Sequence, residues 1–117
     1  MRARSIRALD AFRSPKRPRI FLGMSFTFEW DDEKAAENLT KHGISFSEAS
    51  TVFGDPLSRT ILDPVYSEAE ERFVVLGQSG LQHTLVVVHT YRGAVIRIVS
   101  ARLATSHERK DYERGKD

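Results

Sequence analysis

The sequence contains no cysteine, which excludes a disulfide framework, a thiolate zinc site and a thiol nucleophile. It also lacks long apolar runs, because stretches such as Leu85 to Val88 are far shorter than the roughly 20 residues of a membrane-spanning helix. Neither a glycine-rich phosphate loop nor an H-x-x-x-H or H-E-x-x-H spacing is present. We therefore expect a soluble, cytosolic protein that needs no cofactor, binds no metal and does not attach to a membrane.

The chain is short, and its charge is unevenly divided. Its 117 residues are enough for one hydrophobic core and too few for two. The net charge of +2 combines +6 on residues 1–23, where seven Lys and Arg face one Asp, with −4 on the remainder. The sequence therefore predicts a basic leader over residues 1–23 and a single folded domain over residues 24–117.

The leader has two prolines and no sustained hydrophobic period, as is typical of a disordered or loosely held arm. Three explanations compete for it. It could be a tail that seeks nucleic acid, a weak targeting presequence, or sequence translated upstream of a true start at Met24. We favour the last of these.

One strand and two helices are predicted at the start of the domain. Residues 26–30 alternate aromatic and polar side chains, as in a strand with one buried face. The acids at positions 31–33 then begin a helix that ends at Gly43, a residue that readily adopts the left-handed conformation of a helix end. An S-x-x-E capping box at Ser45 predicts a second helix, which breaks at Gly54.

The second half of the chain is predicted to be mostly antiparallel sheet. Turns that contain Gly80 and Gly93 favour hairpins, and a second capping box at Thr105 opens a final helix. The expected strands cover residues 58–63, 72–76, 83–90 and 94–100. The fold class is therefore α+β, with an antiparallel sheet of about four to five strands, two N-terminal helices packed on it, and a C-terminal helix.

Several ordered motifs carry a family resemblance. They are FEWDDEKAAENLTKHGISFSEASTVFGDP, EERFVVLG, RIVSAR and AT-x-x-ER-x-x-YE, and together they span about Phe26 to Glu113. This combination resembles the BrnT family of ribonuclease toxins from type II toxin–antitoxin systems. The resemblance implies a RelE-like fold and an endoribonuclease that cleaves RNA and so inhibits translation. The leader has no counterpart in the family pattern, which favours a start at Met24.

The resemblance also implies partners. A cognate BrnA-like ribbon-helix-helix antitoxin, encoded beside the toxin, would neutralise it by covering its charged face. The two proteins would form a heterotetramer around an antitoxin dimer, and the antitoxin would hold the assembly on operator DNA. RNA would be the substrate.

The chemistry of such an enzyme requires no metal, because RNA supplies its own nucleophile, the 2′-hydroxyl. The protein must take that proton, stabilise extra negative charge on the phosphate and protonate the leaving 5′ oxygen. From residue type and family position, we expect Arg72 and Arg102 to stabilise the phosphate. Lys41 would contact phosphate or transfer a proton, and Glu71 or His89 would be the base.

Three further residues are expected to bind RNA. Arg97 and Arg109 would position the strand, and His107 is a possible general acid. The helices are expected to leave one sheet face partly open, and Arg72, His89 or Arg97 would meet a ligand there.

Structural explanations exist for several of these residues. Lys41 ends a helix, where the helix dipole favours a cation by roughly 0.3 to 1 kcal/mol. Arg97 can extend its charge from an apolar face into water, and Arg109 can belong to a solvated helix face. His83 is expected to be surface or hairpin structure. Arg102 lies at the junction of a strand and a capped helix, where sites often form, and is the strongest candidate.

Two functions of another class remain open. The chain could be a non-catalytic relative of RelE and ParE that binds a protein target, as the topoisomerase-inhibiting relatives of this fold do. It could also act mainly as a co-repressor with its antitoxin on operator DNA. Cleavage of RNA in the presence of a chelator separates a nuclease from both.

Overall fold

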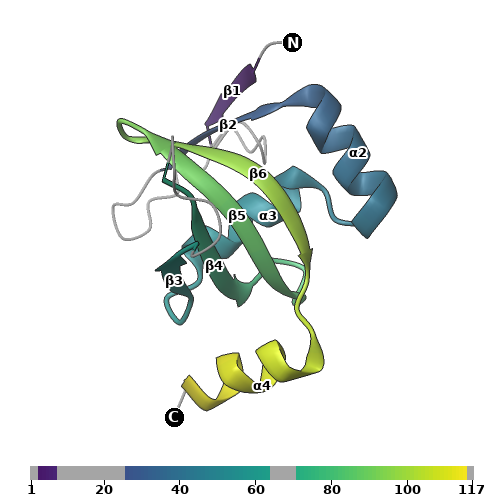
Figure 1. Ribbon diagram of the computed structural model, residues 1–117, viewed down its shortest axis with the longest axis vertical. Coiled ribbons are helices and arrows are strands. Elements are labelled where there is room, and N and C mark those ends of the chain that lie inside the picture. The colour runs from purple at the N-terminus through teal and green to yellow at the C-terminus, as the bar shows by residue number, and fades with distance from the viewer. Residues whose placement is uncertain (1–2, 8–25, 64–70, 116–117) are drawn as a thin grey trace.

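A mixed six-stranded sheet forms the centre of the computed structural model, which describes residues 3–7, 26–63 and 71–115 (Figure 1). The strand order across the sheet is β1-β2-β6-β5-β4-β3. The elements are β1 (Ala3–Arg7), β2 (Thr27–Asp31), α2 (Asp32–His42), α3 (Phe46–Ser50), the 3₁₀ helix η2 (Thr51–Gly54), β3 (Arg59–Leu62), β4 (Phe73–Gln78), β5 (Thr84–Arg92), β6 (Val95–Leu103) and α4 (Ser106–Gly115).

The α+β class is confirmed, but the sheet differs in two ways from the expected antiparallel sheet of four to five strands. Residues 3–7 of the basic leader form β1, which pairs antiparallel with β2 and becomes the sixth strand. In addition, β2 pairs in parallel with β6. Hydrophobic periodicity identifies strands without showing which strands are neighbours, so the pattern could not predict this pairing. The rest of the leader lies outside the described residues.

The predicted ends of α2 are confirmed in atomic detail. Asp31 caps the helix, because its Oδ1 accepts hydrogen bonds from the backbone N–H groups of Glu33 at 2.9 Å and Lys34 at 3.4 Å. Gly43 closes it with φ of 73°, and its N–H donates to the oxygen of Leu39 at 2.9 Å. No helix within the described ranges is long and apolar enough to cross a membrane.

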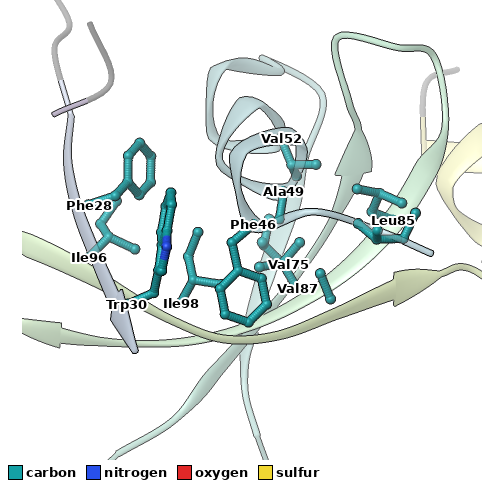
Figure 2. Close-up of a cluster of buried hydrophobic side chains, with 12 residues drawn as sticks. Phe28, Trp30, Phe46, Ala49, Val52, Val75, Leu85, Val87, Ile96 and Ile98 are labelled. Carbon is teal, nitrogen blue, oxygen red and sulfur yellow. The ribbon is translucent and has the colours of Figure 1, made fainter. Parts of the chain in front are cut away.

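The hydrophobic core lies between the sheet and the layer formed by α2, α3 and η2 (Figure 2). The rings of Trp30 and Phe46 meet edge to face, with centroids 5.8 Å apart. We call the sheet face that carries this core the core face. Its buried side chains include Phe28, Trp30, Val75, Leu85, Val87, Ile96, Ile98 and Ala101, which meet Ile44, Phe46, Ala49 and Val52 from the helical layer.

A β-bulge in β6 changes which side chains point toward the core. The register between β5 and β6 shifts between Val88 and His89, so Val99 has no partner in β5. Before the bulge the even-numbered residues of β6 face the core, as Ile98 does, and after it the odd-numbered residues do, as Ala101 does.

The bulge therefore places Arg97 and Arg102 on the same side of the sheet, although one number is odd and the other even. We call this side, opposite the core, the outer face. One row of cross-strand partners on it runs from β6 to β3 and consists of Arg102, Val86, Leu76 and Arg59. A second row includes Thr90, Arg97 and Glu29.

Helix α4 reaches residues of the outer face, whereas α2 and α3 cover the core face. The carboxylate of Glu108 binds Arg102, and the backbone oxygen of Asp111 accepts a hydrogen bond from Arg59. Tyr112, the large side chain of this polar helix, is buried. The C-terminal helix is thus held by polar contacts with Arg102 and Arg59 and by the buried side chain of Tyr112.

Candidate functional site

Arg102 is held rigidly by Glu108 at the junction of β6 and α4. Its Nη1 and Nη2 donate to the two carboxylate oxygens at 2.9 and 3.0 Å, and Nη1 also donates to the backbone oxygen of Leu103 at 3.2 Å. The hydrogen bond from Arg102 lowers the pKa of Glu108 to about 2, and the bond from Glu108 raises the pKa of Arg102. Both groups are therefore charged at neutral pH.

The same carboxylate completes the predicted capping box of α4. The N–H of Glu108 donates to Thr105 Oγ1 at 3.1 Å, and the N–H of Thr105 donates back to Glu108 Oε1 at 2.8 Å. Glu108 thus links the start of α4 to Arg102, so the guanidinium has a fixed position. The Arg102 side chain is still 41% exposed and can be approached from solvent.

Arg97 is paired with a carboxylate that sequence analysis did not identify. Oε2 of Glu29 accepts a hydrogen bond from Nη1 of Arg97 at 3.1 Å and lies 3.2 Å from Nη1 of Arg92. Glu29 is nearly buried, whereas the Arg92 side chain is 57% exposed. The sequence did show that Glu29 lies on the polar side of an alternating strand. It could not show that Arg97 would be its partner, because that contact depends on the parallel pairing of β2 with β6.

His89 is fully buried in an aromatic cluster. Its ring lies 4.8 Å from that of Phe53, 6.0 Å from Phe73 and 5.3 Å from Tyr91, measured between centroids. Nδ1 lies 3.3 Å from the backbone oxygen of Val87, and Nε2 has no hydrogen-bond partner among the described residues. Burial lowers the pKa of His89 to about 4, so the ring is neutral at pH 7.

The expectation that His89 meets a ligand on an open face together with Arg97 is wrong. His89 is 0% exposed and packs on the core face beside η2, whereas Arg97 lies on the outer face. The alternation in β5 placed His89 on the same side as Leu85 and Val87, and that side became the core. For His89 to take a proton from RNA, the hydrophobic core would have to open.

The remaining candidates lie on separate elements. Lys41 is exposed near the end of α2, where it helps to line a shallow surface hollow with Ala36, Glu37 and Thr40. Glu71 is exposed, and Arg72 is half-buried, immediately before β4. The backbone oxygen of Arg72 accepts a hydrogen bond from the N–H of Asp63 at 2.8 Å, which continues the pairing of β3 with β4.

The two candidates on α4 are exposed. Nε2 of His107 lies 3.6 Å from Oδ2 of Asp111, and its side chain is 82% exposed. Arg109 is exposed two residues further along. The structure thus brings Arg97 and Arg102 to one face of β6 and attaches the helix of His107 and Arg109 to it through Glu108.

Other candidates are not gathered with these. His89 lies on the core face, and Lys41 belongs to the helical layer that covers that face. Among residues 3–7, 26–63 and 71–115, no three side chains of His, Asp or Glu come together as metal ligands would. The predicted site residues that the structure brings to one side of the sheet are therefore Arg97 and Arg102, on the outer face of β6.

The fold and this surface define a small α+β domain with arginines presented along one strand to solvent. Residues 30–108 match the family model described as ribonuclease toxin, BrnT, of type II toxin–antitoxin systems, and the chain belongs to this family. It is also similar to a crystal structure of the Brucella abortus ribonuclease toxin BrnT. The two sequences are 21% identical, the match covers 66% of this chain and 94% of the other, and the TM-score is 0.49. A search of curated proteins found no match.

Proposed function

We propose that this chain is the toxin of a type II toxin–antitoxin pair, and that it cleaves RNA without a metal ion and thereby stops translation. The observation that carries the proposal is the family match over residues 30–108, which includes every candidate site residue except Arg109. A cytoplasmic location follows from this function, because both the RNA and the ribosome are there.

The arginines of the outer face support a role in phosphate binding. Arg92 and Arg97 share the single carboxylate of Glu29, which leaves one positive charge in excess. Arg102 is neutralised by Glu108, so an RNA phosphate must share the guanidinium with that carboxylate or replace it. Because Arg102 is already fixed in place, binding costs it little conformational entropy. Lys41, Arg72, His107 and Arg109 stay predictions for contacts with phosphate or for proton transfer.

The proposed cleavage chemistry does not require a metal ion. The 2′-hydroxyl attacks the adjacent phosphate once a base takes its proton, and cationic side chains can stabilise the charge that develops on the phosphate oxygens. Arginine suits the second task, since its planar guanidinium matches the geometry of phosphate oxygens.

The outer face also supports the proposed regulation. A cognate BrnA-like antitoxin that covers Arg97 and Arg102 would block access of RNA to them, and acidic side chains on the antitoxin would complement their charge. We propose that toxin and antitoxin assemble as a heterotetramer, and that operator DNA is bound through the antitoxin.

Cleavage of labelled RNA by the purified chain in EDTA tests the proposal, with Arg102→Gln as the site variant. Arg114→Gln is the matched control, because Nη2 of Arg114 also binds a carboxylate on α4, that of Asp111, at 2.6 Å. We expect wild type and Arg114→Gln to cleave equally in EDTA and Arg102→Gln to be at least about 100-fold slower, as when one transition-state donor is removed.

Other results would redirect the proposal. Cleavage that appears only when Mg²⁺ is restored would contradict metal independence. Intact RNA under both conditions, together with growth arrest in cells, would favour a toxin that acts by binding. Equal rates for wild type and Arg102→Gln would remove Arg102 from the site.

A further inference from the structure

A partly exposed histidine is held by a nearly buried carboxylate at the β4–β5 hairpin. Nδ1 of His83 lies 2.7 Å from Oε2 of Glu48, which comes from α3. The Glu48 side chain is only 8% exposed, while the His83 side chain is 48% exposed. The pair therefore has one member anchored in the protein and one facing solvent.

The role of Glu48 differs from the one that its motif predicts. Ser45 Oγ accepts the N–H of Glu48 at 3.0 Å, which is the first half of the expected capping box. In the second half the glutamate would turn back toward Ser45. The carboxylate instead reaches the hairpin, where it binds His83 and accepts a hydrogen bond from Ser79 Oγ at 2.6 Å.

Ser79 fixes the hairpin around this carboxylate. Its Oγ accepts hydrogen bonds from the N–H groups of Leu81 and His83, both at 3.2 Å, and its own N–H donates to the backbone oxygen of His83 at 2.8 Å. The N–H of Gly80 donates to Thr51 Oγ1 at 2.8 Å. The hairpin backbone that carries His83 is thus hydrogen-bonded within the hairpin and also to η2.

This geometry suits proton transfer. A carboxylate at Nδ1 favours the tautomer with hydrogen on Nδ1, which leaves the lone pair of Nε2 available. No described residue forms a hydrogen bond to Nε2 of His83. A histidine oriented by a carboxylate, with its second nitrogen open to a substrate, is the arrangement of a general base.

We propose that His83 is the residue that takes the 2′-hydroxyl proton during RNA cleavage, and that Glu48 is its positioning residue. This inference rests on the proposed ribonuclease function. It replaces the buried His89 with a histidine that a substrate can reach. The N–H of Ala104 donates to the oxygen of Thr84 at 2.9 Å, so the backbone at the start of α4 lies beside this hairpin. The His83 side chain is held by Glu48 on the side of the helical layer, whereas Arg102 lies on the outer face.

The step conserves atoms and protons. Nε2 of His83 accepts the 2′-hydroxyl proton as the 2′ oxygen bonds to phosphorus. The bond between phosphorus and the 5′ oxygen breaks, and that oxygen takes a proton from water. The hydroxide so formed takes the proton from the imidazolium. The products are a 2′,3′-cyclic phosphate and a 5′-hydroxyl.

The test is the rate of RNA cleavage by His83→Gln across pH 5 to 9. Glutamine can still donate a hydrogen bond to Glu48, so the variant is expected to keep the hairpin and to lose the base. His42→Gln, at an exposed histidine in the last turn of α2, is the matched control. A second variant, His83→Ala, is assayed with and without added imidazole, which can replace a missing base.

We expect His83→Gln to be about 100-fold slower or more, the usual contribution of a general base, and to lose the fall in rate that protonation of a histidine imposes at acid pH. Imidazole should partly restore His83→Ala. Folding of each variant is checked by its thermal midpoint. If wild type cleaves RNA and His83→Gln cleaves it equally with the same pH profile, His83 is only a hairpin residue and the ribonuclease function stands. If wild type does not cleave RNA, both proposals fail.

Discussion

The side-chain amide of Asn38 continues the sheet where β2 stops. Its Nδ2 donates to the backbone oxygen of Ala101 at 2.8 Å, and its Oδ1 accepts the N–H of Ala101 at 3.1 Å. The parallel pairing of β2 with β6 ends at Arg97, so the amide takes the place of a further strand residue on the edge of β6. Nδ2 also donates to the oxygen of Ile44 at 3.0 Å, which joins the corner after α2 to the sheet.

Replacing Asn38 with leucine should lower the free energy of unfolding by about 3 kcal/mol, because buried backbone groups of Ala101 and Ile44 would lose their partners. Urea denaturation at pH 7 measures this change in the free energy of unfolding. Glu37→Ala, at an exposed neighbouring position on α2, should change stability by no more than about 0.5 kcal/mol. A loss below about 1 kcal/mol for Asn38→Leu would show that water can replace the amide.

Gly77 is required because η2 and the residues that follow it approach β4 closely. A Cβ atom at this position would lie 2.8 Å from Cβ of Ser58 and 2.9 Å from Cγ1 of Val52. We expect Gly77→Ala to destabilise the protein by about 1 to 3 kcal/mol through overpacking. Gly54→Ala is the control, since a Cβ there meets no atom within 4 Å, and its thermal midpoint should match that of wild type closely. Equal midpoints for both variants would contradict this contact.

Glu108 should contribute a loss of stability at strongly acid pH. Its pKa is lowered from 4.5 to about 2 in the folded protein, mainly by the hydrogen bond from Arg102. The stabilisation is therefore complete above about pH 4.5 and is lost as the pH falls toward 2. Urea denaturation between pH 5 and 2 should show a smaller decline for Glu108→Gln than for wild type. Parallel declines would mean that the ion pair adds no stability.

His89 should cause a separate loss of folding stability at milder pH. Burial lowers its pKa from 6.5 to about 4, so the unfolded chain binds a proton that the folded protein does not accept until lower pH. Stability should fall as the pH drops from 6.5 to 4, by up to about 3 kcal/mol. His89→Phe keeps an aromatic ring in the cluster and should remove this decline while leaving the one from Glu108. An unchanged profile would show that His89 has the same pKa in the folded and unfolded states.

The parts of the fold that sequence predicted are those set by short-range chemistry. Asp31, Gly43 and Thr105 each act within a few residues of their own position, and all three end or begin a helix as expected. The side-chain alternation in β5 also correctly grouped His89 with Val87. What it could not show was which of the two faces would receive the helices.

Long-range partners account for what was missed. The bulge at Val99 depends on β5, the charge of Arg97 is matched by Glu29 on a distant strand, and the carboxylate of Glu48 leaves its own helix for His83. Local patterns contain no information about such contacts. For the candidate site, residue type identified the arginines of β6, whereas the environment of each histidine required the structure.

The parallel pairing of β2 with β6 has a consequence for how the protein is made. Glu29 and Arg97 are 68 residues apart, so β2 can pair with β6 only after nearly the whole chain has been made. Contacts of such long sequence separation form late in folding. During synthesis, a nascent chain that still lacks β6 has neither the assembled outer face nor the Arg102–Glu108 pair. The surface proposed to bind RNA therefore forms only when translation of the chain is almost finished.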